Sequence, residues 1–212
     1  MQTGADLFRY VNGKMVGRIA MRPAEGAFLV DTVRALPQKS LYVEIGTLWG
    51  GAALLAALAR DDVRVLTVDR MDTDFWRRGD PGVGHKRPTP EIVLKNFAMF
   101  KVADRVSIHL GLSWPWPYPK LRPYLFLVDG DHSYEGCLHD LLTAANLKAP
   151  TVLVHDYRTG RHPGIEQALD EFLSNSAYRL AGCVETLAKL VLVREEAHDE
   201  YGRKDCGWFG LP

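Results

Sequence analysis

Short apolar runs and longer amphipathic stretches alternate along most of the chain. The runs with the character of strands are 41–43, 63–68, 105–110, 124–128, 151–154, 178–184 and 187–193. The intervening stretches that repeat apolar residues at helical spacing are 23–36, the segment after Gly51, 89–100, 134–145 and 163–173. Strands that alternate with helices predict an α/β, doubly wound, mostly parallel sheet with helices on both faces. The last two runs almost touch in sequence, so they predict an antiparallel hairpin.

Three segments lack this periodicity. Residues 1–20 mix apolar and polar types, and both an ordered N-terminal arm and a cap over the site stay open. The roughly twenty residues after Asp69 form a long aperiodic loop, which is typical of a substrate lid, with a surface loop as the alternative. The tail at 195–212 mixes charges with aromatic residues, and either disorder or docking on a partner subunit is consistent with it.

Composition limits the function classes. The chain has 212 residues, 47% hydrophobic and 25% charged, which predicts a single domain over 1–212 with a sizeable core. Its formal net charge of +0 gives no general attraction to nucleic acid or to an anionic membrane. The apolar runs are too short to span a bilayer, the N-terminus lacks the apolar core of a signal peptide, and the three cysteines are widely spaced. We therefore expect a cytoplasmic, reduced protein.

A glycine-rich turn between the first two predicted strands is the first candidate binding element. It runs from Gly46 to Gly51, with Glu44 at the end of one strand and Asp69 at the end of the next. Glycines let the backbone approach a ligand closely, and an acid at the second strand end can accept hydrogen bonds from a ribose. A tight turn with solvent-facing acids is the structural alternative. An acid two residues before the first glycine would repel a pyrophosphate, so the pattern disfavours NAD and suits a cationic ligand.

The pattern E-x-G-T-x-x-G-G resembles the first motif of class I S-adenosylmethionine (SAM) methyltransferases. SAM carries a sulfonium and an ammonium group and no phosphate. The resemblance implies a cofactor site that also uses the end of the third strand, against the adenine. The implied cofactor-binding residues are Glu44, Gly46, Thr47, Gly50, Gly51, Asp69, Arg70, Gly111 and Ser113.

Two further acids follow strands that are predicted to be neighbours. Asp129 ends the run at 124–128, and Asp156 follows the run at 151–154. Neighbouring parallel strands lie about 4.8 Å apart, so the two carboxylates should converge. Converging carboxylates repel unless a proton or a cation lies between them, and oxygen ligands at a hydrated site favour Mg²⁺, with Mn²⁺ or Ca²⁺ as alternatives. Solvated acids or helix caps are the simpler alternative.

The segments DGDHSYEG and VHDY resemble the metal-dependent small-molecule O-methyltransferases of methyltransferase family 24, over about residues 22–193. That family includes sugar and antibiotic-tailoring enzymes and proteins named cephalosporin hydroxylase. The resemblance implies a seven-stranded sheet of order 3-2-1-4-5-7-6, Asp129 and Asp156 as metal ligands, and His132 as general base. The residue before Asp156 is often acidic in relatives, whereas His155 stands here and would soften the site toward Mn²⁺ or Zn²⁺.

These observations predict a SAM-dependent O-methyltransferase that acts on a hydroxyl of a small molecule, with Mg²⁺ or Mn²⁺. A catalytically degenerate scaffold of the same fold is the non-enzyme alternative, and a nucleotide-dependent oxidoreductase is the less favoured enzyme. For His132, helix capping or packing is the alternative to a role as base. His109 alternates with apolar neighbours and is interpreted as a packed or edge histidine. Assembly into a homo-oligomer stays open.

Overall fold

The computed structural model describes residues 2–71, 88–193, 197–198 and 204–205. Its helices are α1 (Gly4–Lys14), α2 (Pro23–Arg34), α3 (Gly51–Ala59), α4 (Pro90–Met99), α5 (Tyr134–Asn146) and α6 (Pro163–Asn175). Its strands are β1 (Leu41–Ile45), β2 (Arg64–Asp69), β3 (Val106–Leu110), β4 (Leu125–Val128), β5 (Thr151–Val154), β6 (Tyr178–Val184), β7 (Leu187–Leu192), β8 (Ala197–His198) and β9 (Lys204–Asp205). Most of the predicted aperiodic loop and most of the tail lie outside the described residues.

Seven strands form one sheet in the order β3-β2-β1-β4-β5-β7-β6, which confirms the predicted fold class and strand order. The pairs from β3 to β5 are parallel. Strand β7 is antiparallel to β6, as the short connector between the last two runs predicts, and it is also antiparallel to β5. The parallel strands β1, β2, β4 and β5 therefore end at one edge of the sheet, where ligands of doubly wound folds bind.

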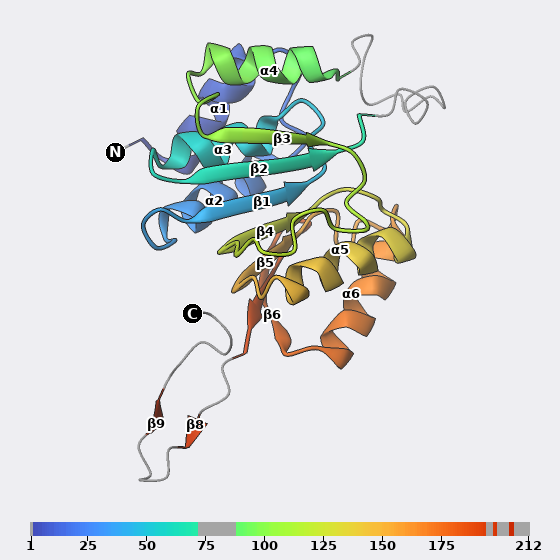
Figure 1. The fold of residues 1–212 in the computed structure, drawn as a ribbon. Coiled ribbons are helices and arrows are strands. Elements are labelled where there is room, and N and C mark those ends of the chain that lie inside the picture. The colour runs from blue at the N-terminus through green and yellow to red at the C-terminus, as the bar shows by residue number, and fades with distance from the viewer. Residues whose placement is uncertain (1, 72–87, 194–196, 199–203, 206–212) are drawn as a thin grey trace.

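Helices cover both faces of this sheet (Figure 1). Alternate strand residues point to opposite faces: Tyr42 joins the core beneath α1, α2 and α3, whereas Val43 and Ile45 join the core beneath α5 and α6. The apolar runs of β4 and β5 are buried along their whole length, apart from the partly exposed Thr151. None of the described helices combines the length and the apolar character that a membrane crossing requires.

Helix α1 was not predicted, since no clean periodicity was recognised in residues 1–20. Thr3 and Asp6 form a capping box at its start, and Leu7, Phe8 and Val11 are buried against the neighbouring helices. The sequence does contain this apolar spacing and a T-x-x-D pattern. Each of these signals covers only a few residues, so neither predicts a helix by itself. Helix α1 therefore forms part of the core on this face of the sheet.

Candidate functional site

The glycine turn after β1 lies directly against the end of β4. Gly46 has φ of +99°, and a Cβ atom at this position would lie 1.9 Å from the carbonyl oxygen of Asp129. Only glycine permits both the left-handed backbone and this close approach. The glycine thereby lets the predicted cofactor turn lie directly against Asp129, the first predicted metal ligand.

Asp69 holds the same turn from the other side. Its Oδ2 accepts hydrogen bonds from the backbone N–H groups of Thr47, at 2.8 Å, and Leu48, at 3.1 Å, while its Oδ1 accepts one from Met71, at 2.8 Å. The carbonyl oxygen of Asp69 accepts from the N–H of Gly111, which brings the predicted adenine-side segment to the end of β2. A carboxylate has about four acceptor positions, and the described residues occupy three of them.

Glu44 departs from the expectation of an acid that faces an open site. It is completely buried, and its Oε2 accepts a hydrogen bond of 2.7 Å from the Tyr42 hydroxyl. Its Oε1 has no hydrogen-bond partner among the described residues. Burial raises the pKa of Glu44 to about 8, although the hydroxyls of Tyr42 and Thr67 act in the opposite direction. The carboxyl is enclosed beneath the turn, and its contact with a cofactor stays a prediction.

The remaining predicted cofactor residues frame the same sheet edge. Gly50 is the N-cap of α3 with φ of +78°, and Gly51 begins that helix. Arg70 is exposed just beyond β2. The Ser113 hydroxyl donates a hydrogen bond of 2.7 Å to Oδ1 of Asp140, a buried acid of α5 whose pKa is raised to about 7 by burial.

The three predicted metal ligands converge. Ligand atoms of Asp129, His155 and Asp156 all lie within 4.8 Å of one another. Nδ1 of His155 lies 3.1 Å from Oδ1 of Asp129 and 3.6 Å from Oδ2 of Asp156. Asp156 adopts a left-handed backbone, with φ of +58°, which aspartate tolerates better than most residues. Two carboxylate oxygens and one imidazole nitrogen form a donor set that fits a divalent cation.

A buried acid of α2 completes this cluster. Oε2 of Glu25 lies 3.3 Å from Nε2 of His155, and the side chains of Glu25 and His155 are only 1% and 7% exposed. Burial alone would lower the pKa of His155, but Asp129, Glu25 and Asp156 raise it to about 11. Burial opposes the ionisation of Glu25, yet hydrogen bonds from His155, Thr186 and Arg22 lower its pKa to about 2.

His132 lies at the rim of the cluster. Its Nε2 is 3.8 Å from Oδ1 of Asp129 and 3.6 Å from Oδ2 of Asp156, and it has no hydrogen-bond partner in the described part of the chain. Against the effect of burial, the two carboxylates raise the pKa of His132 above its usual value. The hydroxyl of Ser133 caps α5, so the capping alternative for His132 is wrong.

His162 joins His132 from the start of α6. The two rings are 4.3 Å apart, and His132, Asp156 and His162 form a second group of potential metal ligands. Gly164 permits this approach, because a Cβ atom there would lie 2.5 Å from the backbone nitrogen of Tyr134.

Sequence reasoning missed Glu25, Asp140 and His162. Glu25 occupies the N3 position of α2, where an acid ordinarily signals only a helix start, and Asp140 lies within a helical pattern. His162 precedes Pro163, a helix-start signal that hides any other role. His109 is confirmed as an edge histidine: β3 ends the sheet, and Nδ1 of His109 lies 2.9 Å from the Tyr118 hydroxyl.

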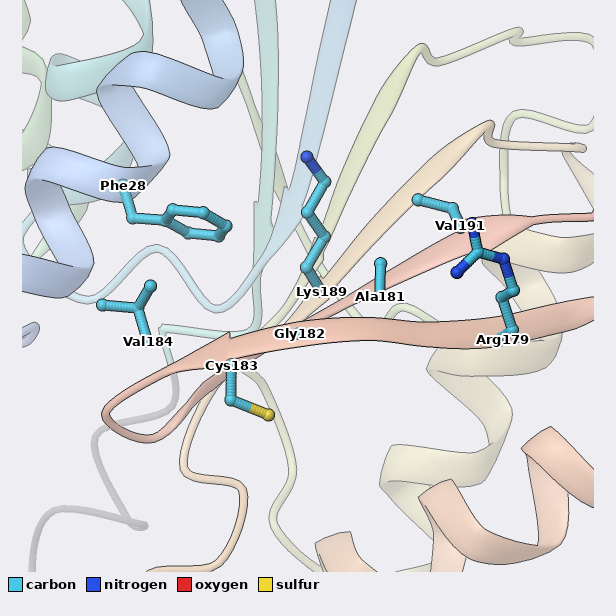
Figure 2. Close-up of a pocket in the computed structure, with 8 residues that line it drawn as sticks. All are labelled: Phe28, Arg179, Ala181, Gly182, Cys183, Val184, Lys189 and Val191. Atoms are coloured by element: carbon cyan, nitrogen blue, oxygen red, sulfur yellow. The ribbon is translucent and has the colours of Figure 1, made fainter.

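A separate groove lies on the α2 side of β6 and β7 (Figure 2), with a volume of about 340 Å³. Its lining residues are Phe28, Arg179, Ala181, Gly182, Cys183, Val184, Lys189 and Val191. The Lys189 ammonium lies 5.7 Å from the centre of the Phe28 ring. The groove contains none of the predicted site residues, so the chemistry-bearing cluster lies elsewhere.

No protein-family model and no curated protein matches the chain. Solved structures do match. Cofactor-bound Rv0187 from MTB has a TM-score of 0.62 at 19% identity, over 86% of this chain and 85% of that one. The O-methyltransferase NovP has a TM-score of 0.61 at 21% identity, over 78% and 79%. The O-methyltransferase TomG from Streptomyces achromogenes, in complex with SAM, has a TM-score of 0.58 at 16% identity, over 91% and 90%.

These structures match most of the chain, whose own sheet has the strand order and the antiparallel β7 that the sequence predicts. The chain therefore has the fold of the class I SAM-dependent methyltransferases.

Proposed function

We propose that the protein is a SAM-dependent O-methyltransferase that acts on a hydroxyl of a small molecule with the help of a divalent metal ion. The observation that carries the proposal is the convergence of Asp129, His155 and Asp156 beside His132, next to the glycine turn. A scaffold would have no need for three potential ligands and an unpaired imidazole nitrogen at the ligand-binding edge of the sheet.

The turn would hold the methyl donor. Backbone N–H groups at the start of α3 suit its carboxylate, and the acceptor position of Asp69 that no described residue occupies suits a ribose hydroxyl. Complexes of structural neighbours with SAM and with S-adenosylhomocysteine support this choice over NAD. Glu44 does not contribute to this choice, because its raised pKa of about 8 leaves the buried carboxyl largely uncharged near neutral pH.

The cluster would serve the acceptor. Asp129, His155 and Asp156 would hold the metal ion, which supplies a positive charge that stabilises an alkoxide. His132 would take the hydroxyl proton on Nε2 while the acceptor oxygen attacks the methyl carbon. The bond between that carbon and sulfur breaks, its electron pair neutralises the sulfonium, and the proton remains on His132. The sheet edge brings the two halves of the reaction together, and such positioning contributes strongly to the rate.

Calorimetric titration with S-adenosylhomocysteine and NAD tests the cofactor class. We expect S-adenosylhomocysteine to bind and NAD to give no heat. Binding of NAD alone would favour the oxidoreductase, and binding of neither would contradict both enzyme readings.

Transfer of a labelled methyl group to a panel of sugars and phenols tests the activity. Asp129→Ala should abolish any transfer found, because it removes a metal ligand. Asp170→Ala changes an exposed acid of α6 and is the matched control, which should retain the wild-type rate. Unchanged transfer by Asp129→Ala would contradict the assigned role of the cluster.

A further inference from the structure

Glu25 is held as an acceptor on all sides. Oε1 accepts hydrogen bonds from the backbone N–H of Thr186, at 2.9 Å, and from the Thr186 hydroxyl, at 2.6 Å. Oε2 accepts from the backbone N–H of Arg22, at 2.8 Å. Three donors favour the carboxylate form, and a carboxylate can only accept. The group that faces His155 is therefore an acceptor fixed in place.

This contact places a hydrogen on Nε2 of His155. Because Nε2 faces Glu25 at 3.3 Å, Nε2 must be the donor. The other nitrogen, Nδ1, then faces the carboxylates of Asp129 and Asp156. Nδ1 can likewise donate to Asp129 at 3.1 Å, so a ring that faces carboxylates on both sides is suited to the imidazolium form. A divalent cation between Asp129 and Asp156 would replace the proton on Nδ1, and Glu25 would keep hydrogen on Nε2.

Carboxylate, imidazole and metal ion in series form a recurrent arrangement, in which the outer acid fixes the tautomer of the ligating histidine. Building on the proposed function, we propose that Glu25 is the positioning residue that presents Nδ1 of His155 to the metal ion. The site is consequently a mixed nitrogen and oxygen site that prefers Mn²⁺, and borderline ions of its kind, to Mg²⁺.

Titration of the purified protein with MnCl₂ and with MgCl₂, followed by calorimetry, tests this assignment. Wild type should bind Mn²⁺ more tightly than Mg²⁺. Glu25→Gln keeps the shape of the side chain but replaces one acceptor by a donor, so it no longer fixes hydrogen on Nε2. We expect its Kd for Mn²⁺ to rise 10- to 100-fold, as is usual when the partner of a ligating histidine is lost.

Asp6→Asn is the matched control. Asp6 is the N3 acid of the capping box of α1, as Glu25 occupies N3 of α2, but it is exposed and outside the cluster. This variant should bind Mn²⁺ like wild type. Equal Mn²⁺ affinity in Glu25→Gln and Asp6→Asn would reduce Glu25 to a helix cap and overturn the proposal.

A spectroscopic measurement on bound Mn²⁺ does not depend on how well Glu25→Gln folds. Electron spin-echo modulation should show coupling to ¹⁴N in wild type and in His132→Gln, and this coupling should disappear in His155→Gln. Mn²⁺ without nitrogen coupling in wild type would overturn the proposal. Affinity for S-adenosylhomocysteine, measured on the same samples, reports separately on the proposed function.

Discussion

At the scale of single residues, the site combines acids whose pKa values are shifted in opposite directions. Burial raises the pKa of Asp140 to about 7, whereas three hydrogen-bonded partners hold that of Glu25 at about 2 despite burial. Both acids are almost inaccessible. The number of hydrogen-bond donors around each carboxylate decides the direction of its pKa shift, and the sequence does not reveal this number.

The first prediction concerns Asp140. The folded protein keeps its proton up to about pH 7, whereas the unfolded chain releases it near pH 4. The folded state therefore binds more protons between these values, and the free energy of unfolding falls as the pH rises through this window. Asp140→Asn removes the titration but retains an acceptor for Ser113. Relative to this variant, wild type should lose about 2–3 kcal/mol between pH 5 and pH 8.5.

Urea unfolding at several pH values measures this difference. A constant gap between wild type and Asp140→Asn across the range would show that Asp140 ionises normally in the folded protein.

The second prediction concerns Gly46. Gly46→Ala places a methyl group against the carbonyl oxygen of Asp129 and strains the backbone, so we expect a loss of about 3–5 kcal/mol of stability, measured by thermal unfolding. Gly13→Ala is the control: nothing lies within 4 Å of the added Cβ, and alanine in α1 should stabilise by up to about 1 kcal/mol. A Gly46→Ala protein as stable as wild type would mean that the turn can move away from β4.

At the scale of elements, one buried side chain ties three segments together. Oδ1 of Asn96, on α4, accepts from the N–H of Val16, at 2.8 Å, and its Nδ2 donates to the carbonyls of Val16, at 2.9 Å, and Trp49, at 3.0 Å. It links the segment after α1 to the glycine turn, in which Trp49 lies. The position of the turn thus depends on α4 as well as on Asp69.

The third prediction follows from this link. Asn96→Ala removes the partner of one buried backbone group, at Trp49, and of two part-buried groups, at Val16, and we expect the free energy of unfolding to fall by about 2–4 kcal/mol. Asn146→Ala, at an exposed position of α5, should change it by less than about 0.5 kcal/mol. Chemical denaturation of both variants provides the measurement. Similar values for the two would mean that the Asn96 network is replaced by water at no cost.

At the scale of the whole molecule, the sequence predicts the architecture well, because strand and helix periods and the chemistry of strand ends are local signals. The convergence of Asp129 and Asp156 follows from the same logic, since strand order places their ends side by side. Glu25 could not be found in this way. Its role exists only because α2 packs near the end of β5 and near Thr186, between β6 and β7, a contact across more than a hundred residues of chain. The burial of Glu44 likewise depends on how the glycine turn packs over it, so the sequence does not predict it.

The insertion of β7 between β5 and β6 has a consequence for biosynthesis. While the ribosome is still making residues 178–192, the nascent chain already contains β5, whose apolar edge has no neighbour on that side until β7 arrives. Glu25 is synthesised 161 residues before Thr186, so it lacks this hydrogen-bond partner until the connection between β6 and β7 has been made. The cluster of acids and histidines therefore lacks its full set of contacts until β6 and β7 have been synthesised. Until then the unpaired apolar edge of β5 is a segment to which chaperones would bind.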